Sequence, residues 1–66
     1  MAGYEIHAGG KFFAARQSLV SACGDAKAEA RLQPGVVLTV HRVGERGSVQ
    51  EAAYKSDGKI VKAVIR

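Results

Sequence analysis

One cysteine and two histidines are the residues that could supply a nucleophile and its base in this chain. Cys23 would have to meet His7 or His41, because thiol chemistry needs a base within hydrogen-bonding distance of the sulfur. Cys23, however, falls on an apolar helical stripe, where a cysteine is usually a neutral packing residue. The two histidines are far apart in the sequence, and nothing near either one completes the three-ligand set that a metal site requires. We therefore expect no catalytic residue and no metal ligand, and we expect each histidine to be a strand residue that faces solvent.

Glycines and carboxylates give no stronger indication of catalysis. Residues 9–11 resemble the end of a phosphate-binding loop, but the upstream glycine and the following Ser or Thr are missing. Asp25 and Glu29 stand one helical turn apart, as ligands of a divalent cation can. Basic residues next to them favour a solvated helix face instead. We expect a protein that is not an enzyme and that carries no cofactor.

The first half of the chain predicts a hairpin followed by a helix. Residues 4–7 alternate apolar and polar, and residues 11–15 can pair back on them, because Gly9 and Gly10 supply the positive φ angles of a tight turn. A helix is predicted over residues 19–32, with Ser18 as its N-cap. A start near Asp25 is the alternative, since Gly24 weakens a helix interior. The alanine-rich stripe of this helix permits a close approach to a sheet.

The second half predicts three strands, over residues 36–43, 48–55 and 60–65. The first is rich in β-branched residues. A glycine-flanked turn separates it from the second, and an Asp-Gly pair at residues 57–58 predicts the last hairpin. The order ββαβββ indicates one α+β domain over residues 1–66. We expect an antiparallel sheet of four to five strands, arranged as a meander, with one helix packed on one face.

The two faces of the predicted sheet differ in composition. Leu38 and Val40 share a strand face with Val36, and these residues are expected to meet the helix. With one helix available, the opposite face should be open to solvent. That face combines apolar with polar residues, which indicates a contact surface, or else β-branched residues chosen for strand propensity alone. Its members are Val37, Thr39, His41, Val43, Ile60, Lys62 and Val64.

Basic residues outnumber acidic ones, ten to six, which gives a net charge of +4 and a pI near 9.7. Nucleic acid or an acidic protein surface is therefore a plausible partner, although many small proteins are simply basic. Tyr4, His41 and Tyr54 could stack on bases only if they share the open face. The candidate contact residues are Arg42, Arg46, Lys59 and Lys62 for charge, and Tyr54, Val37 and Val64 for apolar contact.

The sequence also limits the compartment. A single cysteine cannot form an internal disulfide, which argues against a secreted disulfide framework. The sequence shows neither a membrane-length apolar stretch nor the basic and apolar regions of a signal peptide. We expect a cytoplasmic protein that does not contact a membrane.

The overall layout resembles that of very short proteins encoded by phages and other mobile elements. The resemblance rests on Tyr4 and Ile6 at the start, the alanine-rich helix, Pro34 with Gly35, and the final hairpin. Some anti-CRISPR proteins are similar in size and build. That resemblance, which is one of architecture, implies a non-enzymatic inhibitor that occupies a surface of a protein or nucleoprotein complex. The alternatives are direct, largely sequence-independent nucleic-acid binding and a homodimeric interaction module.

Overall fold

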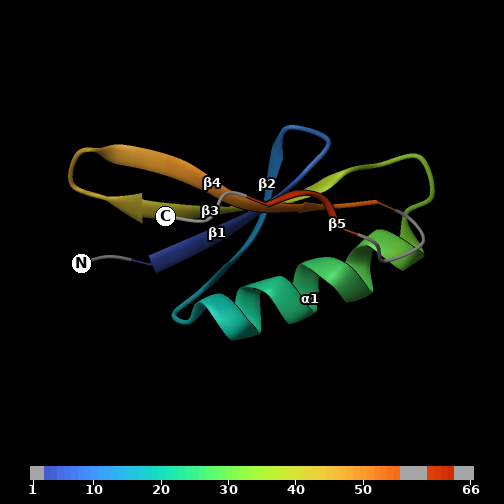
Figure 1. Ribbon diagram of the computed structural model, residues 1–66, viewed down its shortest axis with the longest axis horizontal. Helices are drawn as coiled ribbons and strands as arrows, with labels where there is room; N and C mark the ends of the chain where they lie inside the picture. The colour runs from blue at the N-terminus through green and yellow to red at the C-terminus, as the bar shows by residue number, and fades with distance from the viewer. Residues whose placement is uncertain (1–2, 56–59, 64–66) are drawn as a thin grey trace.

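The computed structural model describes residues 3–55 and, by backbone alone, residues 60–63. Its elements follow the predicted order ββαβββ, and the five strands form one antiparallel sheet with the helix across one face (Figure 1). The prediction of a small α+β domain is confirmed. The elements are β1 Gly3–Ala8, β2 Lys11–Arg16, α1 Leu19–Leu32, β3 Leu38–Gly44, β4 Gly47–Tyr54 and β5 Ile60–Ala63.

Local sequence features account for the hairpin and the helix start. Gly9 and Gly10 join β1 to β2. Their φ angles are 59° and 86°, values that residues other than glycine rarely adopt. α1 begins directly after Ser18, whose Oγ accepts a hydrogen bond from the backbone N–H of Ser21 at 3.1 Å. The helix therefore starts at the predicted cap and not near Asp25. Within the described residues, no helix has the length and hydropathy needed to cross a bilayer.

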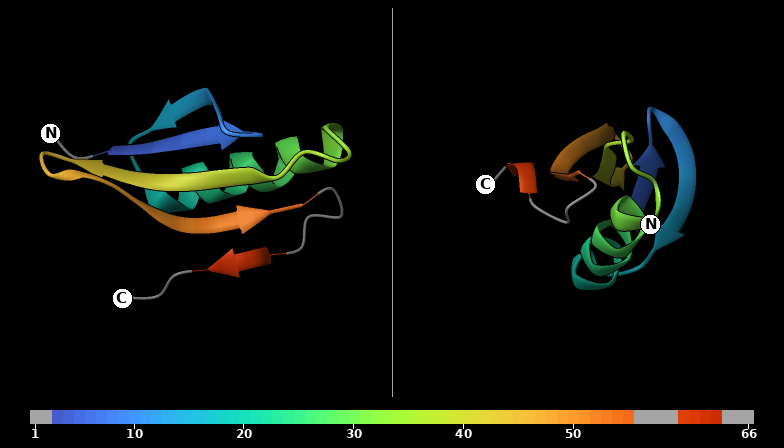
Figure 2. Two further views of the ribbon diagram at one scale, coloured as in Figure 1. Left: turned by 90° about the horizontal axis from the view of Figure 1, so that it is seen from above. Right: turned by 90° about the vertical axis from the view of Figure 1, so that its right-hand side faces the viewer.

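The strand order is β2-β1-β3-β4-β5. β1 pairs antiparallel with both β2 and β3, so these two neighbours run parallel to each other, and α1 carries the chain from one to the other. Figure 2 shows β1 between its two partners, with α1 behind the sheet in the view from above. The predicted meander is correct for β3 to β5 but wrong for the first half. The reason is that a helix between parallel strands must cross over the strand that separates them.

The core lies between the sheet and α1. Among the residues whose side chains are described, Ile6, Leu38 and Val40 are the large ones that are fully buried, and they face small residues on the helix. The buried helix residues are Ala22, Ala26 and Ala30, which recur every four residues and so share one helix face. Because these side chains are short, the helix backbone can approach the sheet closely. The predicted packing of Leu38 and Val40 toward the helix is confirmed.

Candidate functional site

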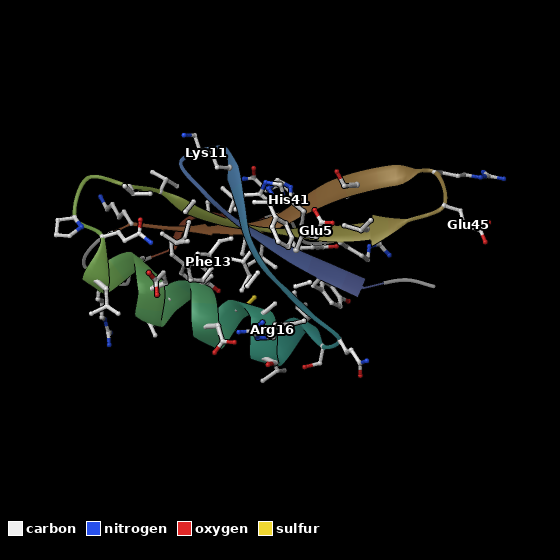
Figure 3. The ribbon with its side chains drawn as sticks, turned by 180° about the vertical axis from the view of Figure 1, so that it is seen from behind. Glu5, Lys11, Phe13, Arg16, His41 and Glu45 are labelled. Atoms are coloured by element: carbon white, nitrogen blue, oxygen red, sulfur yellow. The ribbon has the colours of Figure 1, made fainter. Side chains whose placement is uncertain are left out.

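The face of the sheet opposite α1 is termed the open face. Successive strand residues point to opposite faces, so the burial of Ile6 places Glu5 and His7 on the open face. On β3, the burial of Leu38 and Val40 likewise places Thr39 and His41 there. β1 and β3 pair with Glu5 opposite His41 and His7 opposite Thr39. Figure 3 shows His41 on the side of the sheet away from α1, whereas Arg16 lies beside the helix.

Side chains from three adjacent strands meet on the open face and form what we call the histidine cluster: Glu5, His7, Phe12, Thr39 and His41. The Nε2–H of His7 donates to Oε1 of Glu5 at 3.1 Å, and the hydroxyl of Thr39 shares a hydrogen bond of 2.8 Å with Nε2 of His41. The His7 ring centroid lies 4.5 Å from that of His41 and 6.0 Å from that of Phe12, both with edge-to-face geometry. Two imidazoles are therefore held side by side, each fixed by a hydrogen bond.

A β-bulge lies beside each histidine. The β1–β2 register shifts between Ile6 and His7, which leaves Phe13 as the extra residue of β2. The β3–β4 register shifts between Val40 and His41, which leaves Glu51 as the extra residue of β4. Bulges bend the strand, increase the local twist and redirect side chains, and they are common next to functional sites. The cluster thus occupies the part of the sheet where regular pairing is interrupted on both sides.

Electrostatics keep His41 neutral near pH 7. Burial lowers the pKa of His41, the adjacent His7 lowers it further, and the Glu5 carboxylate acts in the opposite direction. A neutral imidazole offers one donor and one acceptor nitrogen and an apolar ring face. The His41 ring can therefore recognise a ligand by hydrogen bonding and stacking.

Cys23, the candidate nucleophile, lies on the other side of the sheet. It belongs to α1 and packs against the core, whereas both histidines lie on the open face. The sheet therefore separates the thiol from either base. In the described residues, no group of three or more His, Cys, Asp or Glu side chains is arranged to hold a metal ion.

The predicted charged contacts divide by position. Arg46 is exposed in the turn between β3 and β4, at the tip of that hairpin. Arg42 comes two residues after the buried Val40, so its side chain points to the helix side of β3 and not to the open face. Its Nε lies 3.2 Å from Oε2 of Glu51. Lys62 lies in β5 opposite Ala53. Lys59 falls outside the described residues.

The residues predicted to make apolar contacts occupy different environments in the structure. Val37 is exposed, at 42% of its surface, just before β3. Tyr54 is a core residue with 7% exposure, so its prediction as a contact residue is wrong: Tyr54 pairs with the buried Leu38 and shares its face. Tyr4 also packs against the core, so only His41 of the three proposed stacking residues lies on the open face. Val64, like the Asp-Gly pair at residues 57–58, falls outside the described residues.

Sequence reasoning missed the histidine cluster as a unit. The spacing of Glu5 to His7, and of Thr39 to His41, already places each pair on one strand face. What brings the pairs together is the β1–β3 register, which joins residues more than thirty positions apart, such as Glu5 and His41. Only a prediction of β1 as a central strand could have revealed the contact.

Comparisons with known proteins found no match to this chain. No protein-family model matches the chain, and neither a curated protein nor a solved structure does so. The function must therefore be inferred from the chemistry of this chain's own side chains.

Proposed function

We propose that the protein is a non-enzymatic binding domain whose open face contacts another protein or a nucleoprotein complex. The observation that carries the proposal is the histidine cluster, an ordered group of polar and aromatic side chains on a face that no described element covers. A contact of this kind needs no catalytic residue.

The open side of the domain combines fixed polar groups with exposed apolar surface. Phe12, within the cluster, is 60% exposed. An exposed aromatic ring next to ordered hydrogen-bonding groups is typical of interaction sites, where such residues contribute much of the binding energy. Because the imidazoles are already held by Glu5 and Thr39, binding would cost little side-chain ordering.

Charge favours an acidic partner. The chain carries a net charge of +4, and the exposed Lys11 and Arg46 lie at the ends of two different hairpins. Positive charge at the rim accelerates the approach of a negatively charged surface. A nucleoprotein complex offers such a surface. The resemblance to anti-CRISPR proteins implies that the protein blocks such a nucleoprotein complex in the cytoplasm.

Site-specific photocrosslinking tests the proposal directly. Benzoylphenylalanine replaces Phe12 on the open face in one variant and Val20 in the other. Val20 is 85% exposed on α1, so it serves as the matched control. After irradiation of living cells that express the protein, we expect position 12 to form a defined adduct with another macromolecule and position 20 to form none.

Three outcomes would count against the proposal. Equal adducts at both positions would mean that the open face is not selective, and no adduct at position 12 would mean that it is not a contact surface. An adduct between two copies of this chain would replace the proposal with a homodimer. Adding His41→Ala to the position-12 variant should reduce the expected adduct, since the cluster would lose one of its rings.

A further inference from the structure

We propose that the partner bound by the open face is single-stranded nucleic acid, with bases stacked on the rings of the histidine cluster. This inference rests on the proposed function and names the class of partner. It follows from the ring arrangement, the hydrogen-bonding groups, the width of the sheet and the charge of the chain.

Three rings lie in a row across three adjacent strands: Phe12 on β2, His7 on β1 and His41 on β3. Their centroids are separated by 6.0 Å and 4.5 Å, and their planes are inclined to each other by 86° and 68°, so each ring presents its face in a different direction. Phe12, which is 60% exposed, offers the most accessible face for a base. Phenylalanine and histidine rings on a sheet surface are platforms on which unpaired bases stack. Stacking tolerates any base, because every base has a flat π face.

The polar members of the cluster suit base edges better than phosphates. The carboxylate of Glu5 accepts hydrogen bonds from amino groups, as cytosine and adenine present, and the Thr39 hydroxyl can donate or accept. The negative charge of Glu5 repels a phosphate from the centre of the cluster. Bases would therefore lie over the rings, and the backbone would follow the periphery.

The geometry of the sheet favours a single strand over a duplex. Five strands spaced about 4.8 Å apart extend roughly 19 Å, whereas the major groove of DNA is only about 12 Å wide. The whole open face therefore cannot enter the groove. In a duplex the bases are also stacked on one another, so the three rings could not reach their faces.

Basic residues at the periphery complement the phosphates. Lys11 is exposed on the same strand as Phe12, and Figure 3 shows it at the end of the β1–β2 hairpin, on the side away from α1. The net charge of +4 supplies the long-range attraction. From the tip of this hairpin, Lys11 can hold a phosphate at the rim of the open face.

Fluorescence anisotropy with labelled oligonucleotides of about 12 nucleotides tests the inference. The probes are oligothymidine, a mixed-sequence single strand and the duplex of that sequence, each at low salt and at about 150 mM salt. We expect both single strands to bind more tightly than the duplex. Phe12→Ser should raise the Kd about 5- to 150-fold, the loss typical of one stacked base, whereas Val20→Ser should leave it unchanged. Lys11→Gln should reduce the salt dependence of log Kd by about 0.7, the value for one phosphate contact on a single strand.

Three results would overturn the inference. They are the absence of binding at low salt, tighter binding to the duplex than to the single strands, and equal effects of the Phe12 and Val20 substitutions on the Kd. The crosslinking experiment separates this failure from that of the proposed function. A protein adduct at position 12 without oligonucleotide binding would leave the binding face intact and assign it to a protein partner. Absence of any adduct at position 12 would remove both.

Discussion

Ionisation of Tyr54 at high pH should selectively destabilise the fold. Burial, together with the neighbouring Cys23 thiol, raises the pKa of Tyr54 from 10.0 to about 12. Below pH 10 the phenol is protonated in both the folded and unfolded states, so its stabilising contribution is complete. Between pH 10 and 12 only the unfolded chain ionises, and the free energy of unfolding falls.

The size of this effect follows from the pKa difference of about 2 units. At about 1.36 kcal/mol per unit, the loss amounts to roughly 2 to 3 kcal/mol by pH 12. A chain of 66 residues has a typical unfolding free energy of about 3 to 10 kcal/mol. The ionisation of one side chain can therefore remove about a fifth or more of the total stability.

Urea unfolding followed by circular dichroism at about pH 9 and about pH 12 measures the loss. Tyr54→Phe keeps the ring and removes the ionisable hydroxyl, so it should lose roughly 2 to 3 kcal/mol less than the native protein over this interval. Effects of high pH on the rest of the chain are common to both proteins and cancel in the comparison. Cys23→Ala should retain most of the pH dependence, because burial is the larger cause of the shift. Equal losses in the native protein and in Tyr54→Phe would refute the reasoning.

Three further predictions concern the helix, its packing and the open face. Ser18→Ala should lower the unfolding free energy by about 1 kcal/mol, whereas Ser21→Ala, which keeps the backbone donor of that cap, should change it little; similar losses would contradict the assigned cap. Ala26→Leu should cost about 1 to 3 kcal/mol through overpacking against the sheet, and Ala28→Leu on the exposed helix side should be tolerated, as thermal melting of the two variants would show. The pKa of His41 in the folded protein is lowered from 6.5. The contribution of His41 to the free energy of unfolding is therefore present above pH 6.5 and is lost as the pH falls through the pKa of the folded state. His41→Gln should therefore flatten the decline in melting temperature toward pH 5, and parallel declines would argue against it.

Local patterns were sufficient to predict the elements of this fold. Ser18 marked the start of α1, Gly9 and Gly10 marked the first turn, and alternation placed Leu38 and Val40 on the buried face. Each of these features depends on neighbours within a few positions, so the chemistry of individual residues is informative about them.

The position of β1 and the composition of the candidate site could not be predicted in the same way. A meander and the observed order β2-β1-β3-β4-β5 are compatible with the same local patterns, because alternation determines which face a residue joins but not which strand lies beside it. His7 and His41 became neighbours only through that long-range pairing. The face that Tyr54 occupies also depends on a feature outside the local pattern. The bulge in β4 shifts its register with β3 at Val40 and His41, so that counting residues from the turn would give the wrong face.

The crossover from β2 to β3 restricts where this chain can vary in length. The six residues of β2 advance the chain by about 20 Å, and the 14 residues of α1 return it by about 21 Å. A residue inserted into α1 would rotate the alanine face away from the sheet by about 100°. The exposed turn at Glu45 and Arg46 lies under no such restriction, because the strands on either side of it already end there. Evolution or design could therefore extend the molecule at that tip, adding contact surface while the helix and sheet keep their dimensions.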